Sequence, residues 1–320
     1  MEPTNVDGGT PRGGRATRAI VGSIVGGALL VAAVWTASLQ GGSLADGLRA
    51  MRSAEWWLVA MAIVLPIANL FVVSVAFWLL NNRHGSVRLD EMAGLIASAW
   101  LLNYLPLRPG MFGRIAYHKK YNGIGIKASA RVLAETVAMA GIAMAMLASI
   151  VLGLDWIGVE GGPVWWAVAS APLVGGIAVW RGSSDRTVRA YAGAMAMKYA
   201  DVALWAFRYW AVFALIGREI GAREAVAVAV VSQVALLIPL AGNGLGLREW
   251  AVGLLAAALP GWYAMGEDSG AGIGLTADLV NRAAEVMVAI PLGVLGIVGI
   301  ARLVRGRSVR VRASEGAGSK

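Results

Sequence analysis

The chain contains no cysteine among its 320 residues, which excludes disulfide bonds and thiol chemistry. It has only two histidines, His84 and His118, and no H-E-x-x-H pattern, the helical zinc motif of metalloproteases. No Walker-type phosphate-binding loop occurs either, so the sequence does not predict that this chain uses ATP. We therefore predict no catalytic residues, no metal and no cofactor, and expect that the protein is not an enzyme.

Charged residues are also scarce. They make up 15% of the chain, whereas hydrophobic residues make up 58%. A soluble domain of this length has too much surface to cover with so few polar side chains, and the long apolar runs predict an integral membrane protein. The many Ala, Gly, Val and Arg residues, with few Lys, are typical of a GC-rich prokaryotic genome. The predicted location is the cytoplasmic membrane of a prokaryote.

The formal net charge of +9 could indicate nucleic-acid binding, but no basic module with interleaved aromatic residues is present. Lys and Arg crowd the cytoplasmic loops of membrane proteins in general, which accounts for the excess. We predict membrane lipids as partners and no nucleic acid. Whether the chain forms a homo-oligomer, or binds a partner enzyme of lipid modification, stays open.

Six apolar runs are long enough to cross a membrane, the fourth of them marginally: residues 19–39, 56–80, 128–154, 163–180, 190–216 and 273–300. Residues 1–18 read as a disordered tail and residues 305–320 as a basic tail, with a single membrane domain at 19–304 between them. The first run also fits a cleaved signal peptide, but its length and the later spans favour an uncleaved helix.

Two further apolar stretches, residues 91–105 and 225–259, are short or interrupted. The first has 15 residues, where a crossing needs roughly 20. If both stretches enter and return on one side, 19 Lys and Arg residues face the cytoplasm with both termini, and 4 face outside. The predicted fold is an all-α polytopic membrane protein with about six crossing helices and two broken re-entrant segments. Eight crossing helices are the alternative.

Both short stretches carry the same pattern of a Pro-Leu pair, a glycine, and an arginine four residues after the glycine. The matched positions are Pro106-Leu107, Gly110 and Arg114 in the first half and Pro239-Leu240, Gly244 and Arg248 in the second. Because the two stretches enter from opposite sides, the halves at about 56–154 and 190–304 form an inverted repeat. Broken helices at matching positions of such halves point to a transport site.

A broken helix exposes backbone N–H groups that favour anions, and an arginine beside them can bind phosphate through two hydrogen bonds. Arg131 and Glu135, like Arg282 and Glu285, are spaced so that each pair shares one helix face and can form an ion pair. The alternative is that the breaks only end helices and the ion pairs only hold helices together. The candidate substrate-binding residues are Asn103, Arg108, Arg114, Arg131, Glu135, Asn243, Arg248, Glu249, Arg282 and Glu285, and the candidate turn residues are Pro106, Gly110, Pro239, Gly244 and Gly246.

Three charged residues in the span 190–216 favour a structural interpretation. We expect Lys198 and Asp201 to neutralise each other, and Arg208 to extend to a membrane interface. His118, in the sequence Y-H-K-K, is expected to be a solvated loop residue.

The motifs resemble those of the lysylphosphatidylglycerol synthase transmembrane-region family, over about residues 56–304. "LLNYLPLRPGMFGRIAYHKKYNGIGIKASARVLAET" is similar to the family pattern N-x-L-P-x-R-x-G-E-x-x-R and the helix that follows it, with Met111 in place of the acid. "IPLAGNGLGLREW" is similar to P-x-x-G-G-x-G-x-R-E, with Asn243 in place of a glycine, and "LTADLVNRAAEVMVAIPLG" resembles the closing helix. The resemblance implies a membrane domain that handles phospholipids or polyprenyl-type lipids and flips them between leaflets.

We therefore expect a flippase-like lipid translocase for an anionic phospholipid or a polyprenyl-phosphate-type lipid. In the aminoacyl-lipid synthases this domain is joined to a soluble catalytic domain, which is not expected within these 320 residues. Two alternatives remain open: a membrane-embedded glycosyl- or lipid-transferase, and a non-transporting partner subunit of an envelope-lipid biosynthesis complex.

Overall fold

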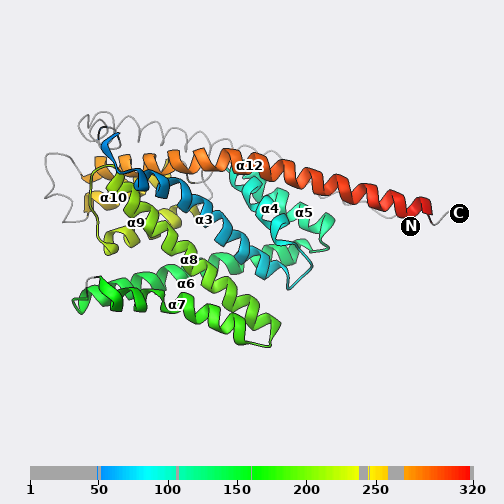
Figure 1. The fold of residues 1–320 in the computed structure, drawn as a ribbon, viewed down its shortest axis with the longest axis horizontal. Coiled ribbons are helices and arrows are strands. Elements are labelled where there is room, and N and C mark those ends of the chain that lie inside the picture. The colour runs from blue at the N-terminus through cyan, green and yellow to red at the C-terminus, as the bar shows by residue number, and fades with distance from the viewer. Residues whose placement is uncertain are drawn as a thin grey trace, which may run out of the picture.

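The computed structural model describes residues 49, 52–105, 108–159, 161–237, 244, 246–258 and 270–317, with side chains as far as residue 306. Within these ranges the protein is helical and contains no strand (Figure 1). Nine helices occur there: α3 (Trp56–Asn81), α4 (Leu89–Leu102), α5 (Pro109–Tyr121), α6 (Ile126–Trp156), α7 (Gly162–Gly182), α8 (Arg186–Leu215), α9 (Ala222–Leu237), α10 (Leu247–Ala258) and α12 (Gly270–Ala317).

Four of these helices are long and apolar enough to span a membrane: α3, α6, α7 and the part of α12 from Gly270 to Gly306. They correspond to four of the six predicted spans. A further predicted span, at 190–216, corresponds to α8. This helix is 30 residues long but carries several charged residues, and it is not among the four apolar helices. The predicted span at 19–39 and the tail at 1–18 lie outside the described residues. The backbone of α12 remains helical to Ala317, well into the predicted C-terminal tail.

The first predicted broken segment is a hairpin of two short helices, α4 and α5, with 14 and 13 residues. At about 1.5 Å per residue, neither is long enough for a hydrocarbon core of about 30 Å. The end of α5 lies beside the start of α4. The Asn122 side chain, directly after α5, donates to Ser86 O (3.2 Å) and to Glu91 Oε1 (3.1 Å). The basic segment after the break was expected to be a loop, but it forms α5.

The second broken segment is also a pair of short helices, α9 and α10, with 16 and 12 residues. α9 packs beside α8, and α10 packs antiparallel to the first half of α12. The two hairpins lie toward opposite ends of the helix bundle (Figure 1). A pair of short helices is therefore present at each place where the sequence predicted a broken segment.

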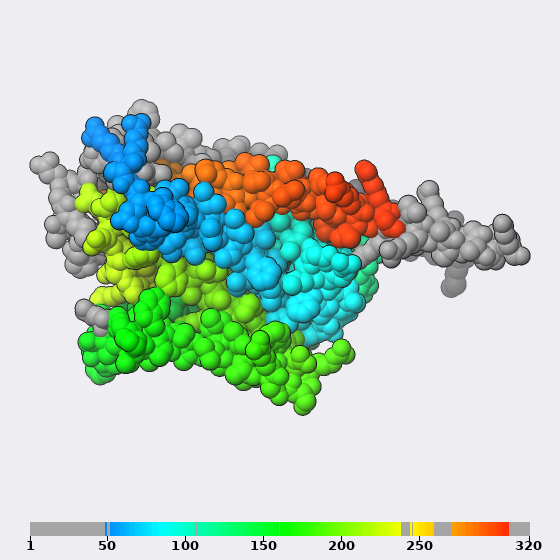
Figure 2. Space-filling model, viewed as in Figure 1, coloured from blue at the N-terminus to red at the C-terminus, as the bar shows by residue number. Residues whose placement is uncertain are grey.

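The long helix α12 supports both hairpins through close glycine contacts. A Cβ atom at Gly296 would lie only 2.6 Å from the carbonyl oxygen of Gly94 in α4. A Cβ atom at Gly274 would lie 3.0 Å from Cα of Gly253 in α10. Small residues let helix backbones approach closely in membrane proteins, where lipid provides no hydrophobic driving force. α12 therefore joins the two halves along one margin of the molecule, with α7 on the opposite margin (Figure 2).

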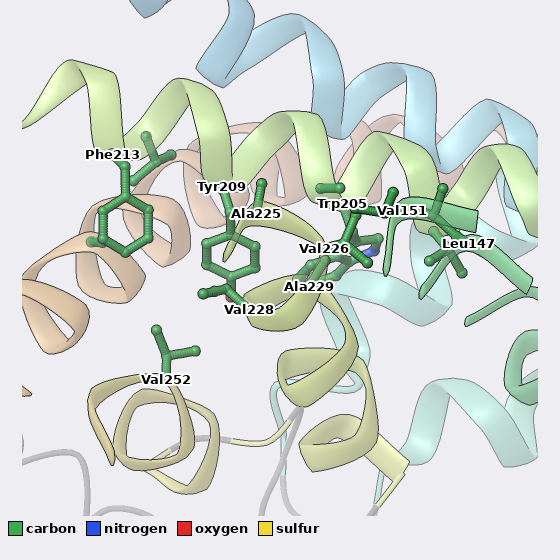
Figure 3. Packing of buried hydrophobic residues seen from close by; sticks show 14 of the residues in the cluster. Leu147, Val151, Trp205, Tyr209, Phe213, Ala225, Val226, Val228, Ala229 and Val252 are labelled. Atoms are coloured by element: carbon green, nitrogen blue, oxygen red, sulfur yellow. The ribbon is translucent and has the colours of Figure 1, made fainter. Parts of the chain in front are cut away.

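The largest buried apolar cluster lies where α6, α8, α9, α10 and α12 meet. Tyr209 and Phe213 of α8 have no exposed surface, and neither do Val228 of α9 and Val252 of α10. The side chains of Tyr209 and Phe213 extend from α8 toward the helices of the second hairpin (Figure 3). This packing fixes α9 and α10 against α8, beside the charged residues described next.

Candidate functional site

The first helix break contacts the last turn of α9, just before the second break. Arg108, at the first break, donates from both terminal guanidinium nitrogens to the carbonyl oxygen of Leu236, in the last turn of α9, at 3.3 and 3.4 Å. Its backbone has φ 48° and ψ 58°, and it is the one non-glycine residue with positive φ in the described ranges. This left-handed conformation costs roughly 1–2 kcal/mol, so the surrounding structure holds it in place.

Asn103 has a local structural role at the same break. Its Oδ1 accepts the backbone N–H of Met111 at 3.2 Å, a donor in the first turn of α5 that also reaches the Arg108 carbonyl oxygen at 3.1 Å. Asn103 was a candidate substrate contact, but its side-chain oxygen serves the helix start. Pro106, Pro239 and Asn243 lie outside the described residues.

The glycines at the two breaks differ in what they do. Gly244 and Gly246 have φ of 70° and 79°, the left-handed region that glycine adopts without a steric penalty. Gly110, by contrast, lies within the first turn of α5 and has no positive φ. A Cβ atom there would collide with the backbone of Ala99 in α4. The predicted turn at Gly110 is therefore wrong, and glycine is needed there because α4 and α5 pack closely.

Arg248, the arginine of the second motif, lies in a buried ion-pair network. Its side chain has no exposed surface, its Nε donates to Asp278 Oδ2 and its Nη1 donates to Glu285 Oε2, both at 2.9 Å. Arg208 also donates to Glu285, at Oε1 and 2.6 Å, and Arg282 forms an ion pair with Glu249. We call these six residues the charge cluster: Arg208, Arg248, Glu249, Asp278, Arg282 and Glu285.

The charge cluster corrects one predicted pair. Arg282 and Glu285 share a face of α12, as their spacing requires, but they do not pair with each other. Arg282 reaches Glu249 of α10 and also lies 3.5 Å from Gly244 O, whereas Glu285 reaches α8 and α10. Ion pairs between helices replace the pair along one helix because α8 and α10 bring their charges against this face of α12.

The pair in the first half forms as expected. Arg131 Nε donates to Glu135 Oε1 at 2.9 Å, and Glu135 also pairs with Arg83 and accepts from the Tyr191 hydroxyl at 2.8 Å. Arg83 stacks over the Tyr191 ring at 4.2 Å. These contacts join α6 and α8 to the loop after α3. They lie apart from the charge cluster and give Glu135 three partners within the protein.

Other charged residues of α8 are buried as well. Lys198 and Asp201 form the expected ion pair, with Asn69 donating to the same carboxylate. Arg208 was expected at an interface, but its side chain is 1% exposed. It donates to Asn281 Oδ1 at 2.7 Å and lies 4.4 Å from the centre of the Trp205 ring. Its buried carboxylate partner on α12 explains the difference, because a paired charge is tolerated at membrane depth.

Sequence reasoning gave no role to four further members of this region: Tyr209, Ser232, Asp278 and Asn281. The Tyr209 hydroxyl donates to Asp278 and accepts from Ser232. The residues at 278, 282 and 285 follow an i, i+4, i+7 spacing, which places them on one helix face. That spacing is the signal that could have identified Asp278.

Several buried guanidinium atoms in the charge cluster have no acceptor in the described part of the chain. They are Arg208 Nε and Nη1 and Arg248 Nη2, and the amide nitrogen of Asn281 shares this property. Arginine provides five N–H donors and no acceptor, so these positions retain capacity for an anionic group or water.

Arg114, the arginine of the first motif, has different surroundings from Arg248. It is half-buried on α5, and its guanidinium carbon lies 3.9 Å from the centre of the Phe77 ring. Within the described residues it forms no ion pair with a carboxylate. The two arginines therefore occupy matched sequence positions, but only the second is neutralised.

A wide groove of about 770 Å³ lies between α6, α7, α8 and α9. Its walls are mainly apolar and include the aromatic rings of Trp165, Trp166, Phe207 and Trp210. Asp155 and Arg223 pair at 3.2 Å where the groove meets the ends of α6 and α9. Along α8 it extends from Tyr199 to Trp210, a rise of about 17 Å, or about half of a hydrocarbon core.

No group of His, Cys, Asp and Glu side chains in the described ranges is arranged to hold a metal ion. No protein family, characterised protein or solved structure matches this chain. The family resemblance of the two motifs stays a prediction.

Proposed function

We propose that the protein binds an anionic lipid, a phospholipid or a polyprenyl phosphate, and moves it between the leaflets of a prokaryotic cytoplasmic membrane. The observation that carries the proposal is the contact between Arg108 and the Leu236 carbonyl. It brings the ends of two short, oppositely placed hairpins together. Broken helices that meet in this way are typical of substrate sites in secondary transporters.

The charge cluster supports an anionic headgroup. Buried donors on Arg208 and Arg248 are unused in the described part of the chain, and phosphate oxygens are suitable acceptors for them. The three arginines are balanced by three carboxylates, so a phosphate that first binds the unused donors would then exchange with a carboxylate on Arg248. Such an exchange lets the site bind an anion without leaving a bare charge in the membrane when it is empty.

The groove between α6 and α9 supports binding of the lipid tail. Its volume of about 770 Å³ falls in the range of about 300–1,000 Å³ that is usual for ligand sites. Its length along α8 corresponds to one leaflet, and its walls are apolar and aromatic. A hydrocarbon chain fits these mainly apolar walls.

The test is a scrambling assay in reconstituted vesicles with a labelled anionic phospholipid. Wild-type protein should speed exposure of the label relative to protein-free vesicles. Arg248→Lys keeps the charge but loses the planar fork, and it should slow transport. Ala203→Trp fills the groove and should slow it as well, whereas Ala178→Trp, on the exposed face of α7, is the matched control and should not.

A folded wild-type protein that gives no acceleration would contradict the proposal and favour a partner subunit without transport activity. Equal rates for Ala203→Trp and Ala178→Trp would remove the groove from the mechanism. These two outcomes are separable, because the first concerns transport and the second concerns the path.

A further inference from the structure

A second polar site lies at the other end of the bundle, between α3, α5 and α6. A small cavity of about 10 Å³ is lined there by Phe77 and Asn81 of α3, Arg114 and His118 of α5, and Ser129 of α6. A volume of this size holds one water-sized group. None of these residues belongs to the charge cluster or to the groove.

Arg114 gives this cavity an uncompensated positive charge. The described carboxylates form no ion pair with it, and its guanidinium carbon lies over the Phe77 ring, 3.9 Å from the ring centre. A cation–π contact uses none of the guanidinium N–H groups as hydrogen-bond donors, so they can still bind an anion. Arg248, its counterpart in the second half, donates from its guanidinium to Asp278 and Glu285.

Two more buried polar atoms at this cavity have no partner in the described residues: His118 Nε2 and Ser129 Oγ. The two residues are only 2% and 6% exposed. His118 was expected to be solvated, but α5 packs it inward, with its Nδ1 3.3 Å from Asn122 Oδ1. The Asn122 amide nitrogen donates to Ser86 and Glu91, so its oxygen faces His118 and accepts from Nδ1.

The polar groups around the cavity favour an anion. Arg114 only donates and the Ser129 hydroxyl can donate to an anion, whereas His118 Nε2 donates only in the imidazolium form, because Nδ1 already donates to Asn122. Ser129 is also the fourth residue of α6, where the helix dipole places positive charge. Lys119, Lys120 and Lys127 are exposed nearby in sequence and attract anions to this end of the bundle.

We propose that this cavity, defined by Arg114, His118 and Ser129, binds one anionic oxygen of a phosphate group, with the rest of that group outside the cavity. In naming a lipid phosphate as the source, the inference rests on the proposed function. The two motif arginines then have different states in this conformation. Arg114 is ready to receive the headgroup, and Arg248 is held by carboxylates until the headgroup arrives.

The test measures binding and not transport. The thermal midpoint of the purified full-length protein is followed against inorganic phosphate in detergent, with chloride at equal ionic strength as reference. A second series uses nanodiscs of phosphatidylcholine with or without phosphatidic acid. A ligand that binds the folded protein raises the midpoint as its concentration increases, which yields an apparent Kd.

Wild-type protein should be stabilised in at least one series. Arg114→Gln should weaken the apparent Kd by about tenfold or more, as expected for loss of a charge-assisted hydrogen bond. Ser129→Ala should weaken it less and serves if Arg114→Gln does not fold. Arg181→Gln makes the same charge change on an exposed side chain of α7, which does not line the cavity, and should leave the Kd unchanged.

Stabilisation by phosphatidic acid supports a lipid source, and stabilisation by inorganic phosphate alone supports a soluble phosphate at the same site. No stabilisation in either series, or equal Kd values for wild type, Arg114→Gln and Ser129→Ala, would overturn the site. Binding through Arg114 without lipid scrambling would contradict the proposed transport function and would still support the anion site.

Discussion

Arg108 and Leu236 are 128 positions apart in the chain, yet the guanidinium of the first donates to the backbone carbonyl of the second at 3.3 and 3.4 Å. The acceptor is one of the last carbonyls of α9, which have no partner within their own helix. The first break thus provides a guanidinium donor, and the end of α9 provides the carbonyl acceptor. This partly buried contact links the two halves of the chain.

Arg248 should be the most sensitive position of the charge cluster. Replacing it by Met leaves Asp278 and Glu285 buried with one cation fewer, and we expect a loss of about 3–5 kcal/mol in the free energy of unfolding. Denaturant unfolding in detergent measures this loss. Arg223→Met removes an exposed ion pair and is the control, with an expected change below about 1 kcal/mol. Equal losses in the two variants would mean that the cluster does not stabilise the fold.

Charge reversal should identify the true partner of Arg282. Arg282→Glu combined with Glu249→Arg restores an ion pair between α12 and α10, so the double variant should be more stable than the sum of the single changes predicts. A coupling of about 0.5–3 kcal/mol is usual for residues in contact. Arg282→Glu combined with Glu285→Arg should show less recovery, because Glu285 pairs with Arg208 and Arg248. The opposite ranking would restore the pair first expected along α12.

Gly110 and Gly113 provide a matched comparison within α5. Gly110→Ala forces a methyl group into the Ala99 backbone, and overpacking of this kind costs about 1–3 kcal/mol. A Cβ at Gly113 meets nothing within 4 Å, so Gly113→Ala should gain about 0.5–1 kcal/mol from helix propensity. Thermal unfolding of both variants decides the point. A neutral Gly110→Ala would show that α4 and α5 do not pack this closely.

The orientation of the helices is open to a direct test. We expect both chain termini in the cytoplasm, because 19 Lys and Arg residues would then face inward and 4 outward. A reporter that is active only in the cytoplasm, fused at Lys320 or Ser183, should therefore be active, and one at Gly161 should be silent. α7 separates the last two sites and is long enough to span. Matching signals at Gly161 and Ser183 would contradict the predicted topology.

Much of the fold was predictable because it depends on local sequence. The apolar run at 56–80 became α3 at Trp56–Asn81, and the run at 128–154 became α6 at Ile126–Trp156. Length and hydropathy determine such helices, since every backbone polar group must be satisfied within a membrane. The chain departs from a helix at both predicted breaks, and the left-handed glycines Gly244 and Gly246 lie in the second.

The contacts of the site depended on packing that no local pattern contains. The spacing of Arg282 and Glu285 placed them on one helix face but could not show that α10 and α8 would bring Glu249, Arg248 and Arg208 to that face. Gly110 was recognised as important for a turn, whereas the backbone of α4 made it necessary. Composition and periodicity determined which segments are helices and where they break, because these features act within a few residues. Only the tertiary structure decided which charges are neutralised and which, like Arg114, are not, because ion-pair partners come from segments far apart in the chain.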